Sequence, residues 1–190
     1  DYINGNRFFG SKPGPFANRI GNARFEIDGT EYKFNPNINE HLLHSGNSAL
    51  ESVVWKHETG SDFVKFVYES PDGEFGFPGN RIIAVTYKWS AELILTIEFS
   101  VTTDKATHLN LTHHSYFNLD GEGSDSILGH RIRINASNVL EVNDDSIPSG
   151  HFIPVENTPL DLRTEQKIAD RIFSDYPILQ KTSGFDQCYV

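Results

Sequence analysis

Residues 81–101 read RIIAVTYKWSAELILTIEFSV, and their side chains alternate as they would on two β-strands. In the second half, Leu93, Leu95, Ile97, Phe99 and Val101 share one face, while Ile94, Thr96, Glu98 and Ser100 share the other. Successive side chains of a strand point to opposite faces of the sheet, so one face of this segment is apolar. The short link Ser90-Ala91 predicts a tight hairpin between residues 81–89 and 92–101.

The same pattern continues on both sides of this hairpin. Residues 25–34 predict a second hairpin around Asp28-Gly29, and residues 63–68 and 130–136 predict further strands. Residues 70–79, rich in Gly and Pro, predict a loop. The one helical candidate is 164–173, which Thr164 could cap. These features predict an all-β fold, and the length of 190 residues fits a single domain spanning residues 1–190.

Composition argues against several classes of partner. The chain carries 26 acidic and 16 basic residues, a formal net charge of -10, which repels phosphate backbones and anionic membrane surfaces. No run of about 18 apolar residues predicts a membrane span. Cys188 is the single cysteine, so an intramolecular disulfide framework and a cysteine-rich zinc site are both excluded. We therefore expect neither nucleic acid nor a membrane as partner.

The two ends of the chain predict an incomplete sequence. The chain starts at Asp1 and contains no methionine, which indicates a processed terminus or the edge of a fragment. Its last residues, 185–190, read FDQCYV, like a strand without a terminator. We expect segments to be missing at both ends.

The segment with the most chemical information is 107–119, which reads THLNLTHHSYFNL. At a period of two, six polar side chains fall on one side: His108, Asn110, Thr112, His114, Tyr116 and Asn118. Such a face is either wetted by solvent or lines a polar cleft, and periodicity alone leaves both interpretations open. Fixed donors and acceptors of this kind suit a hydroxyl-rich ligand.

Other candidates are weak when each is taken alone. Arg19 follows a Gly/Pro-rich stretch and could be a surface residue or an interstrand tie. His44 precedes a Gly turn, where a lone His is more often structural, and Asp186 stands next to aromatic residues near the chain end. No metal signature is visible, because His113 and His114 are expected to point to opposite faces of a strand. No glycine-rich phosphate loop and no nucleophile elbow is present either.

Taken in order, several motifs resemble the aldose 1-epimerase (galactose mutarotase) family. They are Phe9-Gly10, Ala17-Asn18-Arg19-Ile20, Leu43-His44-Ser45-Gly46, Gly76-Phe77-Pro78-Gly79-Asn80, NLTHHSYFNL at 110–119, Ile147-Pro148-Ser149-Gly150, TPLDLR at 158–163, and Gly184-Phe185-Asp186. The resemblance covers nearly the whole chain. It implies a large twisted antiparallel β-sandwich that binds a free sugar such as galactose or glucose and interconverts its α and β anomers, without metal or cofactor.

The resemblance also implies roles for single residues. His114 falls on the family's general acid toward the ring oxygen, and His44 on a second histidine that helps to bind and polarise the sugar. Arg19, Asn18 and Asp186 fall on substrate-binding positions. The family's catalytic Glu, the general base, is expected beyond Val190, and the family's first strands before Asp1.

This sequence departs from the family pattern at several positions. His113 stands where Asn is usual, Gln187 where His is common, and residues 12–15 differ from the usual stretch before the Ala-Asn-Arg-Ile motif. Two other functions stay open. A sugar-phosphate mutarotase would need cations beside the site, for which Arg7, Arg19 and Arg81 are candidates, and loss of the Glu would leave a non-catalytic carbohydrate-binding module. We expect a cytoplasmic location, with a secreted or periplasmic one as the alternative.

Overall fold

The structure is a computed structural model that describes residues 8–190. Arg7, one of the candidate cations for a phosphate, lies outside the described residues. The chain forms two compact units, Asp1–Tyr116 and Phe117–Val190, and each is described here by itself. Within the described part of the chain, no helix is long and apolar enough to cross a membrane.

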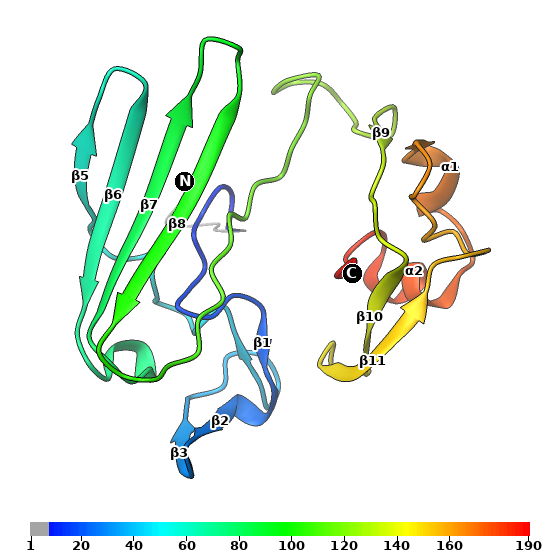
Figure 1. Cartoon of the computed structure of the whole chain (residues 1–190). Helices are drawn as coiled ribbons and strands as arrows, with labels where there is room; N and C mark the ends of the chain where they lie inside the picture. The colour runs from blue at the N-terminus through cyan, green and yellow to red at the C-terminus, as the bar shows by residue number, and fades with distance from the viewer. Residues whose placement is uncertain (1–7) are drawn as a thin grey trace. The chain divides into compact units, whose positions relative to one another are not determined.

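The first unit is built on a four-stranded antiparallel sheet (Figure 1). Its strands follow the chain in order: β5 (Lys56–Thr59), β6 (Phe63–Ser70), β7 (Arg81–Trp89) and β8 (Leu95–Thr103). The strand over 81–89 is confirmed, and the second strand begins three residues later than predicted. The predicted two-residue link is wrong, because Ser90 accepts hydrogen bonds from the N–H groups of Glu92 and Ile94, which extends the connection to residues 90–94.

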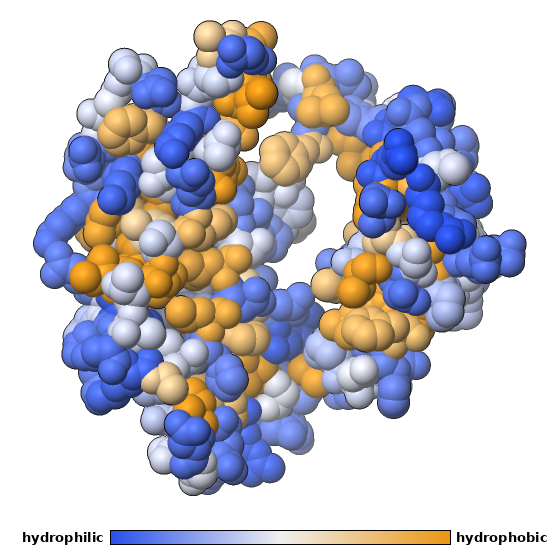
Figure 2. Space-filling view, viewed as in Figure 1, coloured by the Kyte–Doolittle hydropathy of each residue, from blue (hydrophilic) through white to orange (hydrophobic). Residues whose placement is uncertain are grey.

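The two faces of this sheet differ as the alternation predicts. Ile83 and Val85 of β7 are fully buried on one face, where Val85 lies opposite Phe99 of β8. The other face carries exposed ion pairs, including Lys56–Glu69 and Lys88–Glu98. Figure 2 shows apolar side chains gathered over the sheet. The sheet therefore has one apolar and one charged face.

Two short strand pairs complete the first unit. β1 (Arg19–Ile20) pairs with β4 (Leu42–Leu43), and β2 (Arg24–Ile27) pairs with β3 (Thr30–Lys33). The predicted Asp28-Gly29 turn is confirmed, since both residues have positive φ angles, 50° and 78°, as a tight hairpin of this kind requires. A 3₁₀ turn, η1 (Gly21–Ala23), links the two pairs. One hydrophobic core of this unit consists of Ile20, Ala23, Leu42 and Phe77.

The predicted loop over residues 70–79 is confirmed, and it contains the 3₁₀ turn η2 (Glu74–Gly76). The side chain of Arg81 anchors this loop by hydrogen bonds. Its guanidinium is buried and donates to the carbonyl oxygens of Phe77 (2.7 Å) and Glu74 (3.1 Å) and to Oγ of Ser70 (2.6 Å). This set of partners gives Arg81 a structural role rather than a place at a phosphate site.

The polar segment 107–119 is not a regular strand, so that prediction is wrong. Within the first unit it runs extended beside residues 8–17 and pairs with them only at two isolated bridges, Ser11 with His114 and Phe16 with Asn110. Gly14 allows this close approach. A Cβ atom on Gly14 would lie 2.6 Å from Leu111 and 2.8 Å from Leu50, distances at which neighbouring atoms overlap.

The second unit has short elements. They are β9 (Arg131–Ile132), β10 (Asn138–Val142), β11 (Pro148–Pro154), β12 (Gln166–Lys167), α1 (Ala169–Ile172) and α2 (Pro177–Thr182). β10 pairs with β11, and β9 pairs with β12. The predicted strand over 130–136 is confirmed only for the two residues of β9. The predicted helix over 164–173 is largely wrong, because Gln166 and Lys167 pair with β9 and only four residues of this stretch are helical. The core contains Val139, Val155, Leu160 and Leu179.

Candidate functional site

His44 is held in one orientation by the backbone of Asn18. The Asn18 N–H donates to Nδ1 of His44 at 3.0 Å, and the His44 N–H donates to the carbonyl oxygen of Asn18, also at 3.0 Å. A nitrogen that accepts a backbone hydrogen bond cannot carry a proton itself. The neutral ring of His44 therefore has its proton on Nε2, and His44 acts as a hydrogen-bond donor through that atom.

The protonation of His44 follows from its surroundings. Burial lowers its pKa to about 4, and the nearby charges of His114 and Arg19 act in the same direction. His44 is thus neutral at pH 7. Such a ring can polarise a sugar oxygen by donating a hydrogen bond, whereas it cannot provide the proton of an imidazolium.

His114 faces His44 from the neighbouring segment. Their ring centroids lie 5.5 Å apart in an edge-to-face arrangement. The backbone of His114 is fixed by two hydrogen bonds to one neighbouring segment, because its N–H donates to the carbonyl oxygen of Ser11 (3.0 Å) and its carbonyl accepts from the N–H of Gly10 (2.9 Å). Its ring stacks on Tyr116 at 5.0 Å. Among the described residues, no group hydrogen-bonds to the ring nitrogens of His114, so both are free for a ligand.

A cavity of about 350 Å³ lies between these two histidines and the adjoining backbone. It is lined by Ala17, Asn18, His44, Asn110, Leu111, Thr112, His113, His114 and Ser115. Asn110 also closes the wall, since its side-chain amide donates to the carbonyl oxygen of Ala17 at 2.9 Å. The cavity is lined mainly by polar groups, as a hydroxyl-rich ligand requires.

Arg19 and Asn18 stand together beside His44. Nη1 of Arg19 donates to Oδ1 of Asn18 at 3.3 Å. Nε of Arg19 is buried without a hydrogen-bond partner, and within residues 8–190 no carboxylate forms an ion pair with this guanidinium. Asn18 adopts a positive φ of 65°, which places its amide at the turn into β1. The arrangement leaves most donors of Arg19 unused.

Asp186 belongs to the second unit, so the predicted Arg19–Asp186 pairing around a sugar stays a prediction. Its side chain is exposed, and its backbone N–H donates to Oε1 of Gln187 at 3.1 Å. Gln187 is anchored in turn, because its amide donates to Thr182 at 3.0 Å. The carboxylate of Asp186 forms no ion pair in the described part of the chain.

The structure brings together three residues that sequence reasoning did not assign to a site: Lys12, Tyr87 and His113. Nζ of Lys12 lies 4.6 Å from the centre of the Tyr87 ring, and the His113 ring lies 5.6 Å from the same ring. Burial raises the pKa of Tyr87 to about 12 and lowers the pKa values of Lys12 and His113. The only sequence signal was that Lys12 and His113 both depart from the family pattern.

His113 and His114 contact different neighbours, although both border the cavity. His113 contacts Tyr87, and its Nδ1 shares a hydrogen bond with Oγ of Ser115, whereas His114 contacts His44. Across residues 8–190, no group of three His, Cys, Asp or Glu side chains is placed to hold a metal ion.

Comparison with known proteins identifies the family. The model of the family described as aldose 1-epimerase matches residues 1–190. The chain belongs to the aldose 1-epimerase family. It is 38% identical over 186 residues to a galactose mutarotase from Mus musculus, which covers 97% of this chain and 52% of that protein. It is 38% identical over 187 residues to an aldose 1-epimerase from Haemophilus influenzae, covering 96% and 54%.

Solved structures show the same fold. A GalM/aldose epimerase homologue from C. elegans has a TM-score of 0.81 at 32% identity, covering 88% of this chain and 51% of that one. A galactose 1-epimerase from Lactobacillus acidophilus has a TM-score of 0.88 at 24% identity, covering 98% and 56%. The all-β, galactose mutarotase-like sandwich predicted from the sequence is thereby confirmed. The chain spans about half the length of the relatives it matches.

Proposed function

We propose that the protein is an aldose 1-epimerase that interconverts the α and β anomers of a free hexose such as galactose or glucose. The observation that supports this most directly is the pair His44 and His114, 5.5 Å apart at one polar cavity. His44 is fixed as a neutral donor, while the ring nitrogens of His114 are free for a ligand. One histidine can therefore hold the sugar while the other transfers a proton.

In the proposed mechanism His114, in its protonated form, donates a proton to the ring oxygen as the bond from that oxygen to C1 breaks. A carboxylate base removes the proton of the C1 hydroxyl at the same time, so that C1 becomes an aldehyde carbon. We assign this base to the glutamate that the family resemblance expects outside this chain. Such positioned acid and base groups accelerate a reaction by about 10²–10⁴-fold each.

The second half of the reaction reverses these transfers on the other face of the aldehyde. Rotation about the C1–C2 bond presents the opposite face to the former ring oxygen. That oxygen attacks C1, His114 takes back its proton, and the base returns a proton to the C1 oxygen. Electrons and protons balance over the cycle, and no cofactor is consumed.

Substrate binding is assigned to Arg19, Asn18 and Asp186. The guanidinium of Arg19 offers several donors in a fixed plane, and the carboxylate of Asp186 can accept from two adjacent hydroxyls. Holding the sugar in one orientation is what directs the returning proton to the correct atom. Nε2 of His44 completes the set as a neutral donor.

Polarimetry tests the proposal. Freshly dissolved α-D-galactose should reach its equilibrium rotation faster with the intact protein than without it. The β anomer approaches the same equilibrium rotation from the opposite direction, and it should also do so faster with the protein. A rate equal to the uncatalysed one, with galactose still bound, would favour the non-catalytic sugar-binding module.

The cytoplasmic location stays a prediction, which fractionation of the source cells would check.

A sugar-phosphate substrate is less well supported by the described residues. Arg81 is buried and committed to five hydrogen bonds with the loop around η2, so it is unavailable to a phosphate. Arg19 is the remaining described candidate, and a single guanidinium is a weak phosphate site. Assays with galactose 6-phosphate and galactose in parallel would separate the two substrates.

A further inference from the structure

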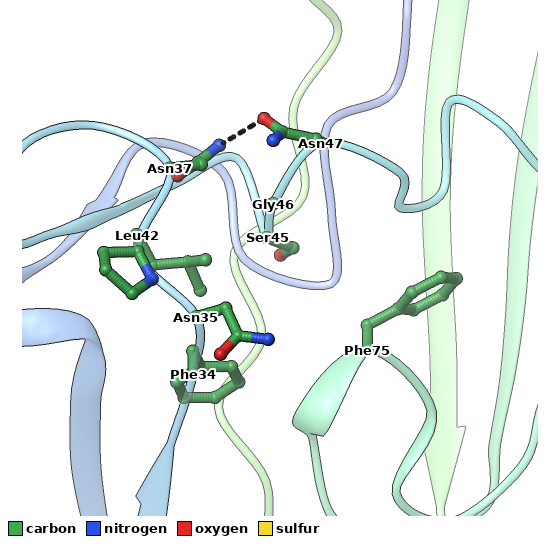
Figure 3. Close-up of a pocket in the computed structure, with 9 residues that line it drawn as sticks. Phe34, Asn35, Asn37, Leu42, Ser45, Gly46, Asn47 and Phe75 are labelled. Atoms are coloured by element: carbon green, nitrogen blue, oxygen red, sulfur yellow. Dashed lines mark hydrogen bonds between the residues drawn. The ribbon is translucent and has the colours of Figure 1, made fainter.

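A second cavity, of about 240 Å³, lies on the other side of the turn that carries His44. Figure 3 shows residues of its wall, in which Phe34 and Phe75 come from different segments. It is lined by Phe34, Asn35, Pro36, Asn37, Leu42, Ser45, Gly46, Asn47 and Phe75. None of these residues lines the cavity between His44 and His114, so the two cavities are distinct.

The polar groups of this second cavity fall into two sets. Asn37 is committed to the fold, because its amide donates to Leu43 (2.9 Å) and to Asn47 (3.3 Å) and accepts from the Leu43 N–H (2.6 Å). Ser45 is also committed, since its hydroxyl bridges the N–H and carbonyl of Phe16. The amide of Asn35 and Nδ2 of Asn47 make no hydrogen bond within residues 8–190. These two groups are available to a ligand.

Phe75 is held at the cavity by a braced loop. It adopts a positive φ of 55°, which is unfavourable for a residue with a bulky side chain, between Gly73 (83°) and Gly76 (84°). The carboxylate of the adjacent Glu74 accepts hydrogen bonds from Tyr68 (2.7 Å) and Ser70 (2.6 Å). Unfavourable backbone conformations that the surrounding structure holds in place are typical of ligand sites.

The two aromatic residues of the cavity have different environments. Phe34 packs against Phe25 and Phe77, with ring centroids 5.2 Å and 4.9 Å away. Phe75 packs against the same core but has no aromatic ring partner among the described residues. Gly76 gives Phe34 its room, since a Cβ atom there would lie 2.7 Å from that ring. The ring of Phe75 is half-buried, so it leaves part of its surface to a ligand.

We propose that this cavity is a second carbohydrate-binding site, which takes a single neutral pyranose ring. The C–H groups on one side of a pyranose form an apolar face that fits an aromatic ring, and its equatorial hydroxyls need neutral donors and acceptors at the edge. Phe75 provides the first, and Asn35 and Asn47 provide the second. The absence of charged side chains from the lining favours a neutral sugar over a sugar acid or phosphate.

The experiment uses methyl β-D-galactopyranoside, a glycoside whose locked anomeric centre prevents turnover, with saturation-transfer NMR on the intact protein. The variant Arg19→Ala should weaken sugar binding at the cavity between the histidines. We expect this variant to retain binding of the probe at the second cavity. Adding Phe75→Ala should weaken that remaining binding about two- to tenfold, the value of one aromatic contact. Asn135→Ala, an exposed asparagine of the second unit, is the control and should change nothing.

Each result decides the proposal. If Arg19→Ala alone abolishes binding of the probe, or if Phe75→Ala leaves the remaining binding unchanged, the second site does not exist. If Phe75→Ala fails to fold, the double variant Asn35→Ala/Asn47→Ala replaces it, and the same weakening is expected. Mutarotation by the unmodified protein is measured separately, so loss of the proposed activity and loss of the second site are distinguishable.

Discussion

The backbone N–H of Asn18 lies 3.0 Å from Nδ1 of His44, and the two residues exchange a second hydrogen bond in the opposite direction. This pairing joins β1 to the turn after β4 and sets which nitrogen of His44 carries the proton. A residue at a proposed sugar-binding position thus also defines the chemistry of its neighbour. The contact uses only the backbone of Asn18, so the side chain of Asn18 can accept its hydrogen bond from Arg19.

The first prediction concerns His114. Replacement by Ala should lower kcat for galactose mutarotation by at least about 10²-fold, because one positioned acid–base group is typically worth that factor. Polarimetry gives the rate, and circular dichroism checks the fold. An unaltered rate would remove His114 from the proposed mechanism.

The second prediction concerns His44 and pH. The folded-state pKa of about 4 lies below the value of about 6.5 for an unfolded histidine. Between these values the unfolded chain binds the proton and the folded chain does not, so the free energy of unfolding should fall as pH drops from about 6.5 to about 4. Above about pH 6.5 His44 is neutral in both states, so it no longer makes the free energy of unfolding depend on pH.

Urea unfolding at pH 7, 6, 5 and 4 measures this dependence. The variant His44→Gln isolates it, because a glutamine oxygen can accept from Asn18 but does not titrate. The wild-type protein should lose more stability across the window than the variant. Equal slopes for the two proteins would mean that His44 has an ordinary pKa in the folded state.

The third prediction concerns Arg19 and Asp186. Replacing either by Ala should raise KM for galactose strongly and leave Tm within a few degrees, since neither side chain forms an ion pair within its own unit of the described chain. Residues that merely tie strands together would show the reverse, a lowered Tm and a normal KM in whatever protein stays folded. Kinetics and thermal unfolding of the same two variants distinguish these outcomes.

The fourth prediction concerns Arg81, which supports the loop that carries Phe75. Arg81→Met should lower the free energy of unfolding by about 3 kcal/mol or more, because several buried acceptors lose their donor at once. The control is Lys88→Ala, which removes an exposed ion pair with Glu98 and should cost no more than about 1 kcal/mol. Similar losses for both variants would contradict the structural role of Arg81.

The fifth prediction is that activity needs no metal ion. Prolonged dialysis against EDTA should leave the rate of mutarotation unchanged, since the proposed proton transfers use side chains alone. Recovery of a lost rate by one specific divalent ion would contradict this prediction.

The strands with strong local signals could be predicted from the sequence. Alternation over residues 81–101 and the Asp28-Gly29 turn report the local backbone directly, and both β7 and the β2–β3 hairpin follow from them. β8 begins later than the alternation predicts, because the side chain of Ser90 forms hydrogen bonds that compete with strand pairing. Such competition depends on geometry that a hydrophobic pattern does not express.

The rest depends on contacts between distant segments. Residues 164–173 have a helical pattern, yet Gln166 and Lys167 pair with β9, so tertiary pairing overrides local propensity. Pro177 begins α2, where its fixed φ is favourable. Motifs indicated His44 and His114, but the meeting of Lys12, Tyr87 and His113 needed the fold.

Gly14 limits how freely this sequence can vary. A Cβ atom at that position would overlap the terminal methyl groups of Leu111 and Leu50, so a substitution there would displace these two side chains. Because Leu111 also lines the cavity between the histidines, a glycine that takes no part in the chemistry sets part of the shape of that cavity.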